Sequence, residues 1–65
     1  MVSIIDIKDN TTIERYTLDY IPQKGDIIDY EVDNKHIQGV VTSITHFLYA
    51  NYRGKICNDI VIRVY

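Results

Sequence analysis

Apolar and polar residues alternate along most of this chain, which is the period-2 pattern of half-buried β-strands. Short segments containing Gly, Pro, Asn or Asp, the residues that favour turns, divide the alternation into five runs. The runs predict strands over residues 2–8, 12–19, 26–32, 36–48 and 56–65. No window of ten or more residues has a 3.6-residue apolar period, so no helix is predicted.

The alternation also predicts which side chains share a face. Three sets are expected to meet in one interior: Ile28, Tyr30 and Val32; Val40, Thr42, Ile44, His46 and Leu48; Ile60, Ile62 and Val64. The first run is apolar on both faces, with Val2 and Ile4 on one and Ile5 and Ile7 on the other. We expect Ile4 to lie outward there, as Ile27 does in the third run.

The run over residues 36–48 is long for one strand of so small a protein. Gly39, followed by the pair Val40-Val41, predicts a bend or bulge through which this strand serves both sides of a closing sheet. The pair Asp9-Asn10 supplies residues that tolerate the left-handed conformation of a tight turn, and Asn34 is the expected left-handed residue of a second turn. These features predict a single all-β domain over residues 1–65, a small five-stranded antiparallel barrel or strongly curled sheet.

The chain from about residue 20 to residue 65 resembles small SH3-like barrel proteins of bacterial, phage or mobile-element origin. The features shared are a proline-started turn with Gly-Asp, an alternating strand, a longer strand with Val-Val-x-x-Ile-x-His, and a closing Ile-x-Ile-x-Val strand. In this chain they are Pro22, Gly25, Asp26, Ile28, Val40, Val41, Ile44, His46, Ile60, Ile62 and Val64. The resemblance implies an SH3-like fold and a bacterial or phage gene, and it transfers no functional residue.

Composition supports the β assignment and narrows the function. Ile, Val and Thr are abundant, whereas there are two Leu, one Ala and one Met. Seven Lys and Arg against nine Asp and Glu give a net charge of −2, which argues against a general nucleic-acid binder. Cys57 is the only cysteine, and no signal peptide or membrane span is visible, so we expect a cytoplasmic protein without membrane contact.

No motif indicates catalysis or a cofactor. Cys57 could be activated only by His36 or His46, and a lone cysteine usually acts as a small apolar residue. The crowded acids between residues 26 and 33 lack metal-ligand spacing and read as a solvated strand face. Three scattered glycines form no phosphate-binding loop. We therefore predict that the chain is not an enzyme and holds neither cofactor nor metal.

One segment indicates a binding surface. Between residues 49 and 55, Tyr49 and Tyr52 alternate with Arg53 and Lys55 without any acid, in an expected loop. So small a barrel cannot bury all of its six tyrosines, and exposed Tyr is favoured at protein interfaces. With Tyr30, these residues predict a surface for a partner protein or for a second copy in a homo-oligomer. The alternative is a single-strand nucleic-acid binder that stacks bases on the same loop.

Overall fold

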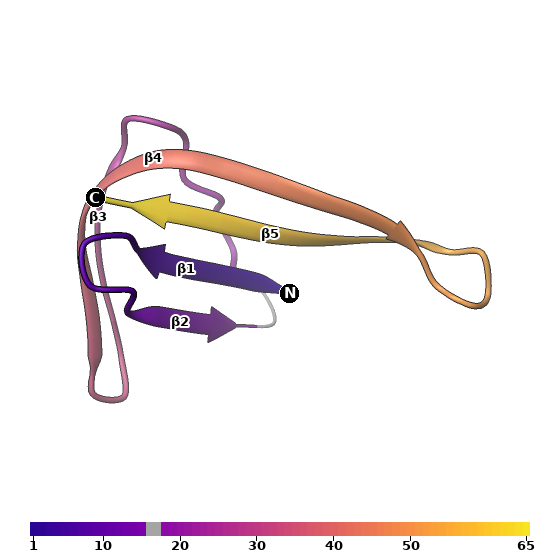
Figure 1. Ribbon diagram of the computed structural model, residues 1–65, viewed down its shortest axis with the longest axis horizontal. Coiled ribbons are helices and arrows are strands. Elements are labelled where there is room, and N and C mark those ends of the chain that lie inside the picture. The colour runs from indigo at the N-terminus through magenta and orange to yellow at the C-terminus, as the bar shows by residue number, and fades with distance from the viewer. Residues whose placement is uncertain (16–17) are drawn as a thin grey trace.

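The computed structural model describes residues 1–15 and 18–65, and the regular elements within them are all β-strands. The strands are β1 (Val2–Asp6), β2 (Thr12–Arg15), β3 (Ile27–Val32), β4 (Lys35–Ala50) and β5 (Ile56–Val64). They form a strongly curved, nearly closed sheet in the order β2-β1-β5-β4-β3 (Figure 1). The predicted all-β, barrel-shaped architecture is confirmed. Tyr16, expected in the second strand, lies outside the described residues.

The sheet is mixed, so the prediction of a purely antiparallel barrel is wrong. β1 pairs antiparallel with β2 but parallel with β5, from Val2 opposite Ile60 to Asp6 opposite Val64. Turn residues encode hairpins between consecutive strands, and they carry no information on how the first and last strands meet. The described residues contain no helix that is long and apolar enough to cross a membrane.

The bend predicted in the fourth strand is confirmed. β4 pairs with β3 over residues 35–40 and with β5 over residues 41–50. At the change of partner, the backbones of Val40 and Tyr65 exchange two hydrogen bonds, of 3.0 and 2.9 Å. Gly39 lies beside this exchange, where an added Cβ would come within 2.5 Å of the Tyr65 carbonyl oxygen. The missing side chain therefore allows β3, β4 and the end of β5 to approach one another.

A β-bulge at Thr42 then changes which residues of β4 face the core. The ladder with β5 skips this residue, and the Thr42 hydroxyl donates to the Arg63 carbonyl oxygen at 3.2 Å. Because the bulge adds one residue, Val41 is buried, Ile44 packs against the core, and Val40 is exposed. The prediction that Val40 shares a face with Ile44 is therefore wrong.

The core is a small apolar cluster inside the curved sheet. Its buried members are Val2, Ile4, Ile13, Ile37, Val41, Ile62 and Val64. Ile28, Tyr30, Val32, Ile44 and Ile60 pack against it. Ile4, expected to face outward, is only 3% exposed. Because β1 is apolar on both faces, its alternation alone could not decide which face is buried; the curvature of the sheet places the face of Val2 and Ile4 inside.

Local backbone conformations fit the tight turns. Of the pair Asp9-Asn10, Asn10 is the residue that takes the left-handed conformation, with a φ of 63°. In the β3–β4 hairpin, however, the left-handed residue is Asp33, with a φ of 55°, rather than Asn34. Because Val32 pairs with Lys35, Asp33 and Asn34 form a two-residue turn. Asp33, the first residue of this turn, takes the positive φ.

Candidate interaction surface

The β4–β5 hairpin extends beyond the barrel as an arm, which we define as residues 47–59. β1 contacts β5 only from Ile60 onward, so within the described chain residues 56–59 pair with β4 alone. Residues 47–50 of β4 pair only with those residues. Figure 1 shows the arm projecting away from the other strands. An isolated two-stranded hairpin is only marginally stable in water.

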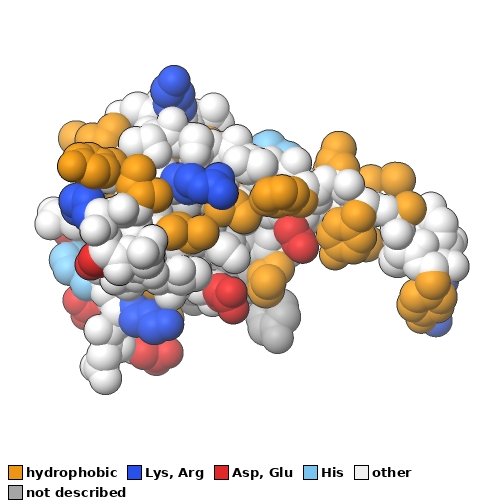
Figure 2. Space-filling view, viewed as in Figure 1, with side chains coloured by type: hydrophobic (Ala, Val, Ile, Leu, Met, Phe, Trp, Pro, Cys, Tyr) orange, Lys and Arg blue, Asp and Glu red, His pale blue; other side chains and the backbone are white. Residues whose placement is uncertain are grey.

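Large apolar side chains gather on the arm. Phe47, Leu48, Tyr49, Tyr52 and Ile56 are between 48% and 90% exposed. Figure 2 shows orange, hydrophobic surfaces along the projecting hairpin. Scattered exposed apolar residues are normal on a protein surface, whereas large exposed apolar patches are typical of interaction sites.

The apolar side chains cover both faces of the arm. Leu48 and Ile56, each 69% exposed, lie on the face that carries Ile44 and Ile62 inside the barrel. The face of the hairpin that lines the core inside the barrel is therefore exposed along the arm. Phe47 lies on the opposite face, which it shares with Tyr49 and Cys57.

The tip of the arm, residues 51–55, is held by the side chain of Asn51. Its Oδ1 accepts hydrogen bonds from the backbone N–H groups of Arg53 at 2.9 Å and Lys55 at 3.0 Å. The guanidinium of Arg53 lies 5.4 Å from the ring centre of Tyr52, within cation–π range. The tip therefore presents an aromatic ring and two cations on an organised loop, with no acidic residue among them.

Near the base of the arm, Asp59 interacts with two groups. Its Oδ1 lies 3.1 Å from the amino terminus of Met1, which ties the arm to the start of β1. The negative charge of Asp59 is also the main cause that raises the pKa of Tyr49 above its usual value, with Cys57 contributing.

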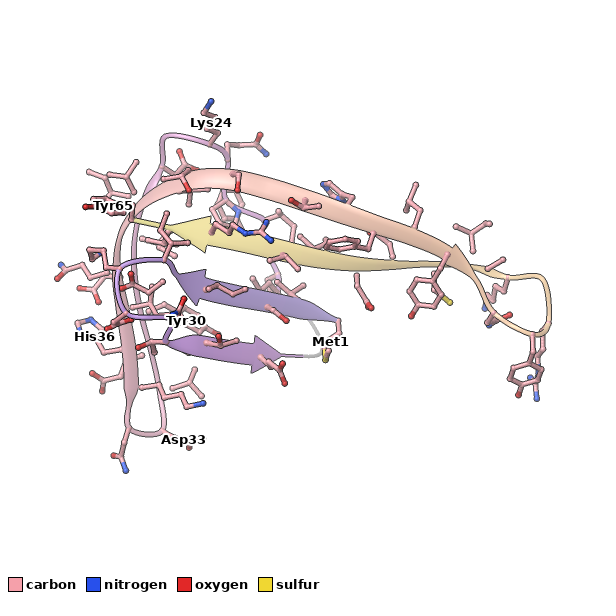
Figure 3. All side chains as sticks on the ribbon, viewed as in Figure 1. Met1, Lys24, Tyr30, Asp33, His36 and Tyr65 are labelled. Carbon is pink, nitrogen blue, oxygen red and sulfur yellow. The ribbon has the colours of Figure 1, made fainter. Side chains whose placement is uncertain are left out.

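Four of the five binding residues predicted from the sequence lie on the arm: Tyr49, Tyr52, Arg53 and Lys55. Tyr49 belongs to β4 and not to the loop, which begins two residues later. The fifth, Tyr30, lies on β3, half-buried against the core and away from the arm (Figure 3).

Sequence reasoning missed three apolar residues of the arm: Phe47, Leu48 and Ile56. Their alternation is that of any half-buried strand, and Leu48 was expected to face the interior. The signal that identifies them is the end of the β1 ladder at Ile60, beyond which nothing among the described residues covers β5.

The groups considered for chemistry are separated in the fold. Cys57 and His46 lie on opposite faces of the β4–β5 hairpin. His36 lies at the other end of β4, where its Nε2 contacts a carboxylate oxygen of Asp29. Among the residues that the structure describes, no three His, Cys, Asp or Glu side chains are grouped to hold a metal ion.

A second surface feature is the open seam between β2 and β3, the two edge strands of the sheet. Near one end of the seam, Lys35 Nζ donates to the Thr12 carbonyl oxygen at 3.1 Å. Elsewhere an open groove of about 640 Å³ lies between β1, the segment before β3, and β3 itself. We call it the seam groove. Its lining includes Ile4, Leu18, Asp19, Ile28, Asp29 and Tyr30.

The seam groove combines apolar lining with acidic groups. Leu18 and Ile28 are half-buried in it, and Asp19 and Asp29 contribute exposed carboxylates, of which that of Asp29 also contacts Nε2 of His36 and Nε2 of Gln38. No lysine or arginine is among its described lining residues. The groove therefore suits a ligand that is apolar and positively charged.

No protein-family model, curated protein or solved structure matches this chain.

Proposed function

We propose that this chain is a non-catalytic binding module that acts through protein–protein contacts and self-associates through its arm. The observation that carries the proposal is the group of large apolar side chains exposed on a hairpin that the rest of the fold leaves uncovered. Burying a side chain such as Leu48 or Ile56 contributes about 1.5–3 kcal/mol, so a few of them supply substantial binding energy.

Size supports the same proposal. A chain of 65 residues buries only about 60% of the surface that its unfolded form exposes, and small domains often compensate by association. The bent β4, which serves both halves of the sheet, supports an SH3-like barrel as the fold, although the parallel β1–β5 pair departs from a purely antiparallel barrel. A reducing, cytoplasmic setting suits the lone thiol of Cys57.

Molar mass in solution tests the proposal. We expect the wild-type chain to show at least the mass of a dimer by light scattering at micromolar concentrations, and the double variant Leu48→Ser/Ile56→Ser to show the mass of one chain. The matched control is Ile7→Ser/Tyr65→Ser, which removes apolar groups exposed on the barrel. A wild-type protein that remains monomeric, or an arm variant that associates as the wild type does, would contradict the proposal.

The second candidate is a single-strand nucleic-acid binder that uses the tip of the arm. The observation in its favour is the pair Tyr52–Arg53, in which a ring and a cation lie together with Lys55 nearby. Phosphate-driven binding weakens steeply as salt rises, whereas burial of apolar side chains does not. A gel shift with single-stranded DNA or RNA at low salt that disappears in Arg53→Ala would support this candidate over the first.

A further inference from the structure

We infer that the arm of one copy seats in the seam groove of a second copy. The inference rests on the proposed function, that the arm is a contact surface, and it names both the occupant and its binding site. Three properties of the molecule carry it: the distribution of charge, the match of apolar surfaces, and the direction in which the arm points.

Charge is divided unevenly between the barrel and the arm. Residues 1–50 contain eight of the nine acidic residues and four of the seven basic ones. Between residues 46 and 58 there is no acid, and the charged residues there are Arg53 and Lys55. The seam groove has the opposite character, with Asp19 and Asp29 and no cation among its described lining residues. Complementary charge of this kind guides association and selects the partner.

The apolar surfaces match as well. Beside its acids, the seam groove offers the half-buried Leu18 and Ile28 and the exposed Ile27. The outer half of the arm offers Tyr52 and Ile56, which are among its most exposed side chains. An aromatic anchor that fills an apolar pocket, with charged groups at the rim, is the arrangement in which a few residues supply most of the binding energy.

The direction of the arm requires that the groove belong to another copy. Figure 1 shows the arm leading away from the barrel, and its tip is the part farthest from the remaining strands. The tip therefore cannot reach the seam groove of its own chain. The contact also covers part of the exposed edge of β3, a strand edge that would otherwise invite uncontrolled pairing.

Charge reversal on each surface tests the inference. The arm-reversed variant is Arg53→Glu/Lys55→Glu, and the groove-reversed variant is Asp19→Lys/Asp29→Lys. Because each variant alone opposes like charges, we expect its self-association to weaken by at least about tenfold. In an equimolar mixture each arm meets a groove of opposite charge, so association is expected to return. Circular dichroism verifies that every variant is folded, and light scattering measures the mass.

The control is Glu14→Lys/Glu31→Lys, which changes the net charge by the same amount as the groove-reversed variant but lies outside the seam groove. If the groove-reversed variant associates as the wild type does, or if the mixture stays monomeric, the seam groove is not the binding site of the arm. In that case the arm is still a contact surface for self-association, provided that Leu48→Ser/Ile56→Ser abolishes association. If that arm variant also associates normally, the proposed function itself is wrong.

Discussion

At the residue scale, the β3–β4 pair contains a contact that titrates. His36 and Asp29 lie diagonally across the pair, and both side chains are largely exposed. The hydrogen bond to Asp29 is the main cause that raises the pKa of His36 above its usual 6.5. The folded-state pKa is therefore higher than the unfolded one. This contact stabilises the fold fully below about pH 6.5, and its contribution is lost as pH rises through the folded-state pKa.

The replacement His36→Gln should therefore lower the free energy of unfolding at pH 5.5 and leave it nearly unchanged at pH 8.5. Urea unfolding at the two pH values measures the difference. The control is His46→Gln, because the ring of His46 contacts the uncharged amide of Asn58. A loss that is equal at both pH values would show that the contact contributes through packing and not through charge.

A substitution at Gly39 tests whether the fold requires the close approach of strands at the bend. A Cβ there would lie 2.5 Å from the Tyr65 carbonyl oxygen and 3.0 Å from Val64 Cγ1. We expect Gly39→Ala to destabilise the fold by about 2 kcal/mol or more, because backbone must move. Gly25→Ala is the matched control: its φ of 94° is also unfavourable for alanine, but its Cβ would meet open space. Chemical denaturation of both variants should give the larger loss for Gly39→Ala.

At the scale of the elements, the sequence predicts local structure and fails where distant strands meet. The β1–β2 and β3–β4 hairpins follow from alternation and turn residues, and so does the bend at Gly39. The parallel pairing of β1 with β5 depends on contacts between the two ends of the chain, which no local pattern encodes. The bulge at Thr42 shifts the faces of β4 by one residue, and a pattern read from Val40 onward cannot detect that shift.

The sequence predicts the loop of the candidate site, which is local, and fails for the residues whose exposure depends on where distant strands meet. The loop around Tyr52 and Arg53 is conspicuous in the sequence because it combines aromatic and cationic residues without acids. Leu48 and Ile56 are not conspicuous, because an apolar residue in a strand ordinarily indicates a core. Only the end of the β1 ladder shows that their part of the hairpin lies outside the barrel.

That difference between arm and core is measurable on a single strand. Ile62 and Ile56 both belong to β5 and lie on the same face, but Ile62 is fully buried and Ile56 is exposed. We expect Ile62→Ala to cost about 2–5 kcal/mol of unfolding free energy, as other large-to-small core substitutions do. Ile56→Ala in dilute, monomeric protein should stay within about 0.5 kcal/mol of the wild type. Equal losses at the two positions would show that the arm is packed against the fold.

At the scale of the whole molecule, the barrel and the arm differ in what stabilises them. The barrel has an interior in which its strands bury a shared apolar cluster. In the part of the chain that the structure describes, the arm contributes no buried residue to that cluster, and it is held by the ladder between its own two strands, the Asn51 side chain at its tip and the ion pair between Met1 and Asp59. Under the proposed self-association, a second copy buries part of the arm, so the stability of the folded chain should depend on the protein concentration.

Thermal unfolding over a range of protein concentrations measures that dependence. Binding that favours the folded state adds about 2.7 kcal/mol when the free partner is at 100 times Kd. In a domain of this size, such a gain raises the melting temperature by at least about 10 °C. We therefore expect the wild-type melting temperature to rise between low micromolar and high micromolar protein, and that of Leu48→Ser/Ile56→Ser to stay constant. A wild-type melting temperature that does not change with concentration would show that the arm gains nothing from a second copy.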